Sequence, residues 1–233
     1  MRVRIGRVLP FAALALLVAS AGEMRADVLF SNLDPPGTPY SAWWIVGNTG
    51  SGAQVDAFPF SPTQSGVLTG ADLPLAGSNG SNGSIATPVS PITVYIESNS
   101  GGQPGAILDT LTQSGSYSSY PTTTVVNFTC SGPCTTLDAG TTYWIVGQQT
   151  NAANATYWLY NGGDTGSWFF NNVNSATGPW TTATAGNTFG NFDVTGTAVT
   201  PAVPEPASLA LLGSGLVGIM AAARRRIWRR QSL

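Results

Sequence analysis

Cys130 and Cys134 are the only two cysteines of the chain, and three residues, Ser-Gly-Pro, separate them. Gly-Pro is typical of a tight turn, so in an oxidising compartment the pair favours a structural disulfide. A loop this short stabilises a fold only modestly. The alternatives are a redox-active pair and half of a metal site. The spacing is not the two-residue gap of thioredoxin-like motifs, and no other Cys and no His could complete a zinc site.

Carboxylates are the only acid–base groups that the centre of the chain offers. Two carboxylates can hydrolyse a glycoside, but nothing in the sequence sets one pair apart, so no catalytic residue and no enzymatic activity are predicted. Carboxylate oxygens also suit calcium, and Asp164, in a Gly-rich loop, is the best candidate. The Asp residues are scattered, however, and form no D-x-D-x-D-G loop. A solvated acidic surface is therefore favoured, with no metal site and no cofactor.

Tryptophan is abundant in the same region. Six of the seven tryptophans lie there: Trp43, Trp44, Trp144, Trp158, Trp168 and Trp180. Exposed aromatic rings on a β-sheet can serve as platforms for sugar rings. Trp158 and Trp168, set among Asn and Gly, are predicted to be more exposed than Trp144 and are the candidate sugar contacts. The competing interpretation places these rings in the core, as is usual for aromatic side chains in strands.

The distribution of charge excludes several functions. All nine basic residues are Arg, four of them before residue 26 and five after residue 223. Residues 27–203 contain eight Asp and Glu97 and no Lys, Arg or His, so their net charge is −9. Without a cation this region cannot neutralise phosphates, which argues against nucleic acid as a partner. Without a His it cannot perform Ser-His or Cys-His catalysis.

The first 26 residues have the three parts of a secretory signal peptide. Basic residues precede an apolar run, Val8 to Val18, and the small residues Ala19 to Ala21 follow. Cleavage after Ala21 fits the small-x-small rule, and Ala26 is a second candidate. The sequence therefore predicts export by the Sec machinery. The alternative, an uncleaved anchor, is disfavoured because the apolar run is short.

Residues 27–194 are predicted to form one all-β domain, a β-sandwich of the jelly-roll kind. In the run 92–97, Ile92, Val94 and Ile96 face one side, whereas Glu97 faces the other. The run 142–146 suits a strand buried at least partly on both faces. Turns rich in Gly and Asn separate such runs. Further strands are predicted near residues 28–30, 43–46, 55–60, 66–69, 106–111, 124–129, 156–160, 167–170 and 188–194.

Two segments resemble each other: WWIVGN at 43–48 and YWIVGQ at 143–148. A duplicated half-domain could leave such a trace. Because one short match does not establish a repeat, we interpret them as two independent core strands.

The pattern of the C-terminal end predicts a membrane-associated tail. A Thr-, Pro- and Ala-rich linker, 195–203, precedes Pro204, Glu205 and Pro206, and an apolar run, 207–223, follows. At 1.5 Å per residue this run is roughly 25 Å long, at the short end for a transmembrane helix. By the positive-inside rule the Arg residues behind it stay cytoplasmic and stop translocation. These are Arg224, Arg225, Arg226, Arg229 and Arg230, in an Arg-rich tail that ends at residue 230.

The order of these parts over residues 204–230 resembles the PEP-CTERM sorting signal. In that family the tripeptide, here Pro204-Glu205-Pro206, is the recognition element. An exosortase, a membrane cysteine transpeptidase, processes the tail near it. The resemblance implies transient anchoring by the helix 207–223, a final place at the cell surface or outside the cell, and an association with exopolysaccharide or biofilm. A plain single-pass anchor is the alternative.

The central domain also resembles a group of exported domains named choice-of-anchor. The features that carry this resemblance are the strand 92–97, the turn ending Gln103-Pro104-Gly105 with Leu108 after it, and Leu137-x-x-Gly140-Thr141-x-Tyr143-Trp144. It implies a β-sandwich framework and brings no active site. The sequence therefore predicts a non-enzymatic surface or extracellular-matrix protein. A carbohydrate-binding adhesive module, with extracellular polysaccharide as its partner, is the second hypothesis, and a carboxylate-dependent hydrolase the third.

Overall fold

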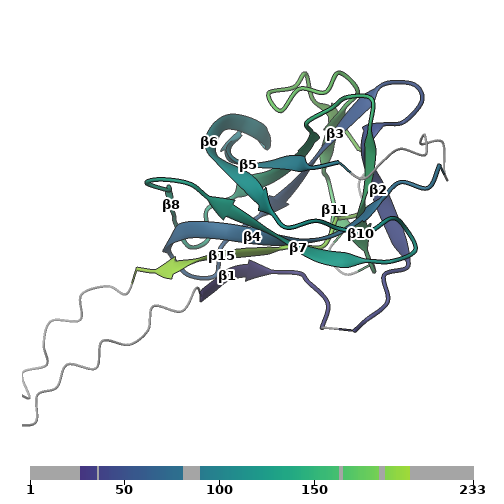
Figure 1. Ribbon diagram of the computed structural model, residues 1–233. Coiled ribbons are helices and arrows are strands. Elements are labelled where there is room, and N and C mark those ends of the chain that lie inside the picture. The colour runs from purple at the N-terminus through teal and green to yellow at the C-terminus, as the bar shows by residue number, and fades with distance from the viewer. Residues whose placement is uncertain (1–26, 36, 81–89, 163–164, 184–186, 200–233) are drawn as a thin grey trace, which may run out of the picture.

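The computed structural model describes residues 27–35, 37–80, 90–162, 165–183 and 187–199 (Figure 1). The predicted signal peptide, the tripeptide Pro204-Glu205-Pro206, the apolar run and the Arg-rich tail lie outside these ranges. Within them, no helix has the length and hydropathy needed to cross a membrane.

All regular elements in the described ranges are β-strands, which confirms the predicted all-β class. The longer strands are β1 (Asp27–Ser31), β2 (Ala42–Asn48), β3 (Ala53–Phe60), β4 (Gly66–Gly77), β5 (Ile92–Ser100), β6 (Gln103–Ser114), β7 (Thr124–Cys130), β9 (Tyr143–Gln149), β10 (Ala155–Tyr160) and β15 (Asp193–Ala198). The short ones are β8 (Thr136–Leu137), β11 (Thr165–Gly166), β12 (Phe169–Asn171), β13 (Thr181–Thr182) and β14 (Asn187–Thr188).

An 8-stranded antiparallel barrel forms the body of the domain, in the order β4-β10-β2-β3-β9-β5-β6-β7, and β7 pairs back with β4. β4 closes the ring because it is long enough to contact both neighbours. Its residue Leu75 lies opposite Trp158 of β10 on one edge and opposite Thr124 of β7 on the other. Closure leaves these strands with few free edges.

The predicted sandwich of two separate sheets is corrected to this closed barrel. The closing ladder joins residues 70–75 of β4 to residues 124–129 of β7. Period-two alternation tells which face of a strand is buried, but it does not tell which strand is its neighbour. The strand predicted at 66–69 is also longer than expected, since β4 continues through Gly70 and Pro74 to Gly77.

Alternate side chains fill the barrel interior as the sequence predicts. Ile92, Val94 and Ile96 of β5 are buried there together with Phe58 and Trp158. The outer face of the β3-β9-β5 wall is covered as well, because Trp144 and Val146 pack with Ala176 from the segment after β12. The expectation that the run 142–146 is buried on both faces is confirmed, since Tyr143–Gly147 are all buried.

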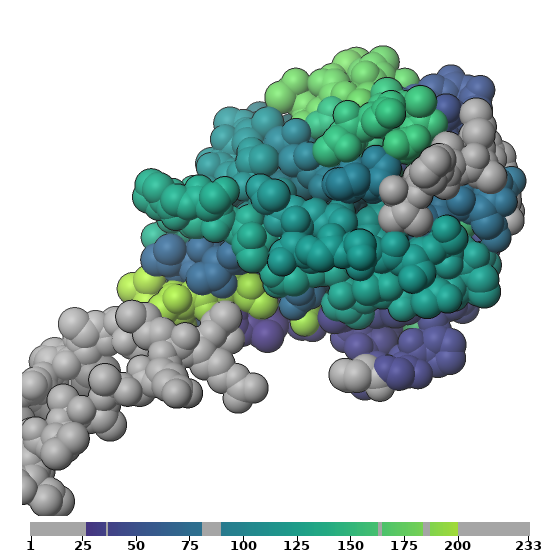
Figure 2. Space-filling view, viewed as in Figure 1, coloured from purple at the N-terminus to yellow at the C-terminus, as the bar shows by residue number. Residues whose placement is uncertain are grey.

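The folded domain extends beyond the predicted boundary at residue 194. Residues 195–198, expected to belong to the linker, continue strand β15. They pair with β4 from Gly70 to Gly66, while β1 pairs with the other edge of β15. β1 therefore begins next to the end of β15 (Figure 1). In Figure 2 the yellow-green C-terminal strand lies along the lower edge of the molecule.

The two similar segments WWIVGN and YWIVGQ lie in β2 and β9, and both strands flank β3. β9 pairs with β3 over five residues, from Asp56 to Phe60. β2 pairs with it only at Gly47 and Asn48. The two segments thus share a neighbour but make very different lengths of ladder with it.

Candidate functional site

The barrel wall splits between β2 and β3. The two strands pair only next to their turn, at Gly47 and Asn48. Away from the turn they separate, and β3 pairs instead with β12, at Val55, Asp56 and Ala57. β2 keeps its ladder with β10 on the opposite edge over its whole length from Ala42 to Gly47. Among the described residues, no strand pairs with the edge of β2 that faces the split.

A cleft of about 530 Å³ lies at this split. Its walls come from β2, β3, β12, β13 and β14 and from the segments next to them. The lining residues are Trp43, Trp44, Ile45, Gln54, Trp168, Phe170, Thr182, Ala183 and Asn187. Aromatic rings dominate the wall, and three uncharged polar side chains interrupt it. Pockets for small molecules commonly combine an aromatic surface with a few polar groups in this way.

Contacts among the aromatic residues fix the rings of the cleft. The ring centroids of Trp44 and Trp168 are 4.5 Å apart, and those of Trp168 and Phe170 are 5.8 Å apart. Trp44 also stacks on Tyr160, and its indole Nε1 donates a hydrogen bond to the backbone oxygen of Thr188 at 2.8 Å. Trp44 and Phe170 are half-buried, so part of each ring remains accessible. The cleft therefore has a preformed aromatic surface.

The free edge of β2 adds backbone groups to the cleft. Asn48 donates its backbone N–H to Asn154 of the turn before β10. Because backbone groups alternate in direction along an antiparallel strand, the N–H and C=O of Ile45 and Trp43 point the other way, toward the split. Both residues line the cleft, and neither has a ladder partner there among the described strands. These donors and acceptors are thus available beside the rings.

Behind the cleft wall lies a buried carboxyl group, that of Asp56. The ladders of β3 place it opposite Gly147 of β9 and Phe170 of β12. Its Oδ1 accepts a hydrogen bond from Gln54 Nε2 at 2.7 Å, and its Oδ2 has no partner among the described residues. Burial raises the pKa of Asp56 to about 8, against the smaller lowering effect of the Gln54 hydrogen bond. At neutral pH this group is therefore mostly protonated.

Trp158 and Trp168, the predicted sugar contacts, are both buried. Trp158 is 0% exposed, its Nε1 donates to the backbone oxygen of Asn191 at 2.8 Å, and its ring meets Phe58 edge-on. Trp168 is 3% exposed, as is Trp144, so the expected difference in exposure is wrong. The reason is alternation, since β10 turns Trp158 toward the barrel interior. Trp168 still forms part of the cleft wall.

The cleft instead presents the ring of Trp44, whereas Trp43 points to the opposite face, packs on Tyr157 and Tyr120, and contributes its backbone. The accessibility of Trp44 follows from the divergence of β2 and β3, and the residues themselves give no signal of where two strands separate.

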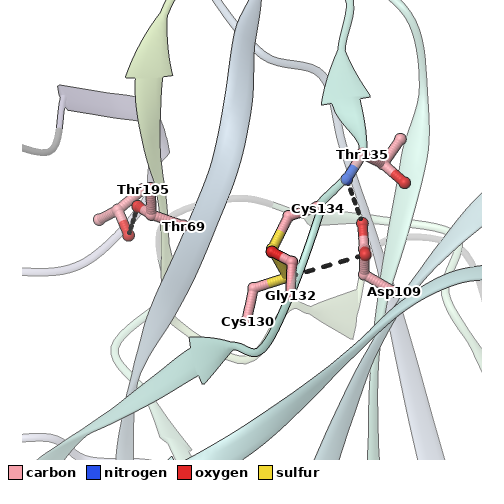
Figure 3. Close-up of a disulfide and its surroundings, with 7 residues drawn as sticks. All are labelled: Thr69, Asp109, Cys130, Gly132, Cys134, Thr135 and Thr195. Atoms are coloured by element: carbon pink, nitrogen blue, oxygen red, sulfur yellow. Dashed lines mark hydrogen bonds between the residues drawn. A yellow bond between two sulfur atoms is a disulfide. The ribbon is translucent and has the colours of Figure 1, made fainter.

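The predicted disulfide between Cys130 and Cys134 is confirmed, with Cα atoms 6.3 Å apart (Figure 3). It closes the turn between β7 and β8. Asp109 of β6 lies beside it, with Oδ1 3.7 Å from Cys130 Sγ, and its Oδ2 accepts the backbone N–H of Thr135 at 2.9 Å. Asp109 and the two cysteines form the one group of candidate metal ligands in the described ranges. Because both sulfurs are joined to each other, neither offers a thiolate.

Glu97 is a second buried carboxyl group, and it does not meet Asp56. Neither of its oxygens has a partner among the described residues, and burial raises its pKa to about 8. Glu97 lies opposite Trp144, whereas Asp56 lies opposite Gly147, three residues further along β9. Because side chains alternate between faces, the two carboxyl groups lie on opposite faces of the sheet. They do not form a catalytic pair.

Two further carboxylates, Asp34 and Asp193, line a second hollow, also of about 530 Å³. Asp34 Oδ2 accepts hydrogen bonds from Asn161 and Asn191, at 3.1 and 2.8 Å. Burial, followed by the charges of Asp34 and Asp193, raises the pKa of Tyr40 to about 12. Asp164, the candidate calcium ligand, lies outside the described residues.

Residues 202–226 match the model of the PEP-CTERM protein-sorting motif. The chain therefore carries this sorting motif at its C-terminal end, over the residues where the resemblance was found. The motif defines the class: an exported protein that is sorted to the cell surface and processed by an exosortase. No curated protein and no solved structure matches the chain significantly. The resemblance of the barrel domain to the choice-of-anchor group remains a prediction.

Proposed function

We propose that this exosortase substrate is a non-enzymatic surface or extracellular-matrix protein associated with exopolysaccharide. The observation that carries the proposal is the PEP-CTERM motif at 202–226. Exosortase would process the tail near Pro204-Glu205-Pro206 and release the barrel domain from its transient membrane anchor. The domain would then remain at the cell surface or in the matrix outside it.

Properties of the barrel domain support a non-catalytic role. Residues 27–203 contain no Lys, Arg or His, so carboxyl groups are the only candidate acids and bases. The two fully buried ones, Asp56 and Glu97, lie on opposite faces of the sheet. A closed antiparallel barrel with a disulfide suits an oxidising compartment outside the cytoplasm.

Intact mass of the protein recovered from the cell envelope and the medium tests the sorting. We expect a species that begins after Ala21 or Ala26 and ends near residue 204. A strain without the exosortase should retain the tail on a membrane-bound species. Recovery of the protein in the cytosol with Met1 and Leu233 both attached would refute the proposal.

A strain unable to make its exopolysaccharide tests the association. In the parent strain we expect the processed protein to sediment with the extracellular matrix, and in the mutant to appear free in the medium. Equal distribution in the two strains would remove exopolysaccharide from the proposal while leaving the sorting intact.

A carbohydrate-binding adhesive module is the second candidate function. The specific observation in its favour is the cleft between β2 and β3, where half-buried aromatic rings and uncharged polar groups line the same cavity.

A further inference from the structure

We infer that the cleft between β2 and β3 binds a neutral glycan chain, with the rings of Trp44 and Phe170 contacting the sugar and uncharged polar groups binding its hydroxyls. This inference rests on the carbohydrate-binding candidate function. It adds where on the molecule the glycan binds and that the glycan carries no charge.

The shape of the cleft suits a short stretch of sugar rings. Its volume, about 530 Å³, lies within the range of roughly 300–1,000 Å³ found for small-molecule pockets. The rings of Trp44 and Trp168 lie 4.5 Å apart and are tilted by 48°, so the wall is rigid and aromatic. The C–H face of a pyranose ring packs on such a surface, and a rigid surface loses little conformational entropy when it does so.

The polar groups of the cleft match hydroxyls. Gln54 and Asn187 carry amides, and the free edge of β2 adds the backbone groups of Trp43 and Ile45. This set contains both donors and acceptors and no charge. A sugar hydroxyl is itself both donor and acceptor, so it can pair with any of them. Gln54 is held in place because its Nε2 is already bonded to Asp56.

The negative charge of the domain disfavours the binding of an acidic glycan. Residues 27–203 carry eight Asp and Glu97 but no cation, so a uronate, sulfate or phosphate group would be repelled. Asp56, directly behind the wall, is mostly protonated at neutral pH, so it provides no group that would attract an anion. A neutral chain avoids this repulsion, since it brings no charge of its own.

A peptide strand is a poorer occupant. Only Trp43 and Ile45 point their backbone groups into the split, so the free edge is shorter than the five or six residues of a typical strand. A strand added at this edge would make few ladder bonds and would have to displace the aromatic contacts between Trp44 and Trp168.

Two neighbouring phenylalanines of β12 allow a matched test. Phe169 and Phe170 are both half-buried, and side chains alternate along a strand, so their rings point to opposite faces. Phe170 lines the cleft, whereas Phe169 packs on Trp144 at the other face. Phe170→Ala removes a ring from the wall of the cleft, and Phe169→Ala removes the same ring from the other face.

The test uses the full chain purified in detergent, so its result does not depend on export or processing. The neutral probes are hexasaccharides of glucose, mannose and xylose, and the acidic probe is a galacturonate hexasaccharide. Binding is followed by calorimetry and by tryptophan fluorescence. We expect at least one neutral probe to bind and the acidic probe to bind at least tenfold more weakly. Phe170→Ala should weaken the neutral probe at least tenfold, and Phe169→Ala less than twofold.

Several results would overturn the inference. One is the absence of binding for all three neutral probes, and another is tighter binding of the galacturonate probe. Equal losses in Phe169→Ala and Phe170→Ala would place the site elsewhere. If Phe170→Ala instead dissociates a dimer of the chain in light scattering, the cleft holds a second copy and not a glycan. None of these results would affect the sorting proposal, which intact mass tests separately.

Discussion

Gln54 and Asp56 are two residues apart on the same face of β3, and the amide of the first donates to the carboxyl of the second at 2.7 Å. Gln54 lies in the wall of the cleft, while Asp56 is fully buried behind it. The polar surface of the cleft is thereby fixed by a group that solvent does not reach. A carboxyl group in this position makes the stability of the barrel depend on pH.

Asp56 and Glu97 should make the protein less stable as pH rises. Burial raises the pKa of each to about 8, far above the values near 4 expected in the unfolded chain. Between about pH 4 and pH 8 the folded state holds protons that the unfolded state has lost. We therefore expect the free energy of unfolding to fall with rising pH, by up to about 1.4 kcal/mol per pH unit for each group. Urea titrations from pH 4.5 to 8.5 measure this slope.

The variants Asp56→Asn and Glu97→Gln identify the groups responsible. Each replaces a carboxyl by a neutral amide of the same shape, so each should flatten the slope and raise stability at pH 8.5, with little change at pH 4.5. Asp138→Asn, at an exposed position, is the matched control and should leave the slope unchanged. An unchanged slope in both buried variants would contradict the assignment.

Trp158→Ala should destabilise the barrel by about 3–5 kcal/mol, because it removes a large side chain that is 0% exposed. Trp43→Ala should cost less, since Trp43 is half-buried and packs mainly on Tyr157 and Tyr120. Urea midpoints of the two variants give the comparison. Similar small losses in both would mean that Trp158 is not a core residue.

Gly70→Ala tests the closure of the barrel. A Cβ at this position would lie 2.2 Å from the backbone oxygen of Phe128, where β4 and β7 pair. The clash is with backbone, so the closing ladder must open, and we expect a loss of at least about 3 kcal/mol in the free energy of unfolding. Gly101→Ala is the control: its φ is positive but its Cβ would meet nothing within 4 Å, so it should cost only about 1 kcal/mol. Equal losses would argue against the close approach of β4 to β7.

Replacing both cysteines by serine should lower the free energy of unfolding by about 2 kcal/mol, the amount expected when a cross-link closes a loop of about five residues. Reduction of the wild type with dithiothreitol should have the same effect in urea titrations. If reduction of the double variant also lowered its stability, the effect would have a source other than this disulfide.

The processed protein should resist trypsin even when it is unfolded. Trypsin cuts after Lys and Arg, and residues 27–203 contain neither. We expect no tryptic cut beyond Arg25 in moderate urea, while chymotrypsin, which cuts after aromatic residues, should degrade the protein. Tryptic fragments that retain part of the Arg-rich tail would show that processing had not occurred.

Local pattern was enough to predict the strands and their buried faces. Ile92, Val94 and Ile96 enter the core as their alternation predicts, and Glu97 faces the opposite side. Glu97 is nevertheless buried, because residues about 75 positions further along cover that face, Phe169 and Ala176 among them. No pattern within the strand carries that information.

The features that could not be predicted from the sequence depend on pairing between strands that are far apart in the chain. The strand predicted at 66–69 continues in the structure, where the Gly70 backbone approaches β7 closely and Pro74 lies within the ladder. The closed barrel and the position of the cleft both follow from which strands meet and where they separate. The sorting motif was predictable because its three parts are consecutive in the chain.

The position of β15 has a mechanical consequence. This strand is hydrogen-bonded to β1 on one edge and to β4 on the other, and it leads directly toward the sorting tail. Tension that enters the domain through Ala198 acts along the axis of the strand, so it shears both ladders at once and does not unzip them bond by bond. A domain pulled from this end therefore has to break the hydrogen bonds of both ladders together before β15 comes free.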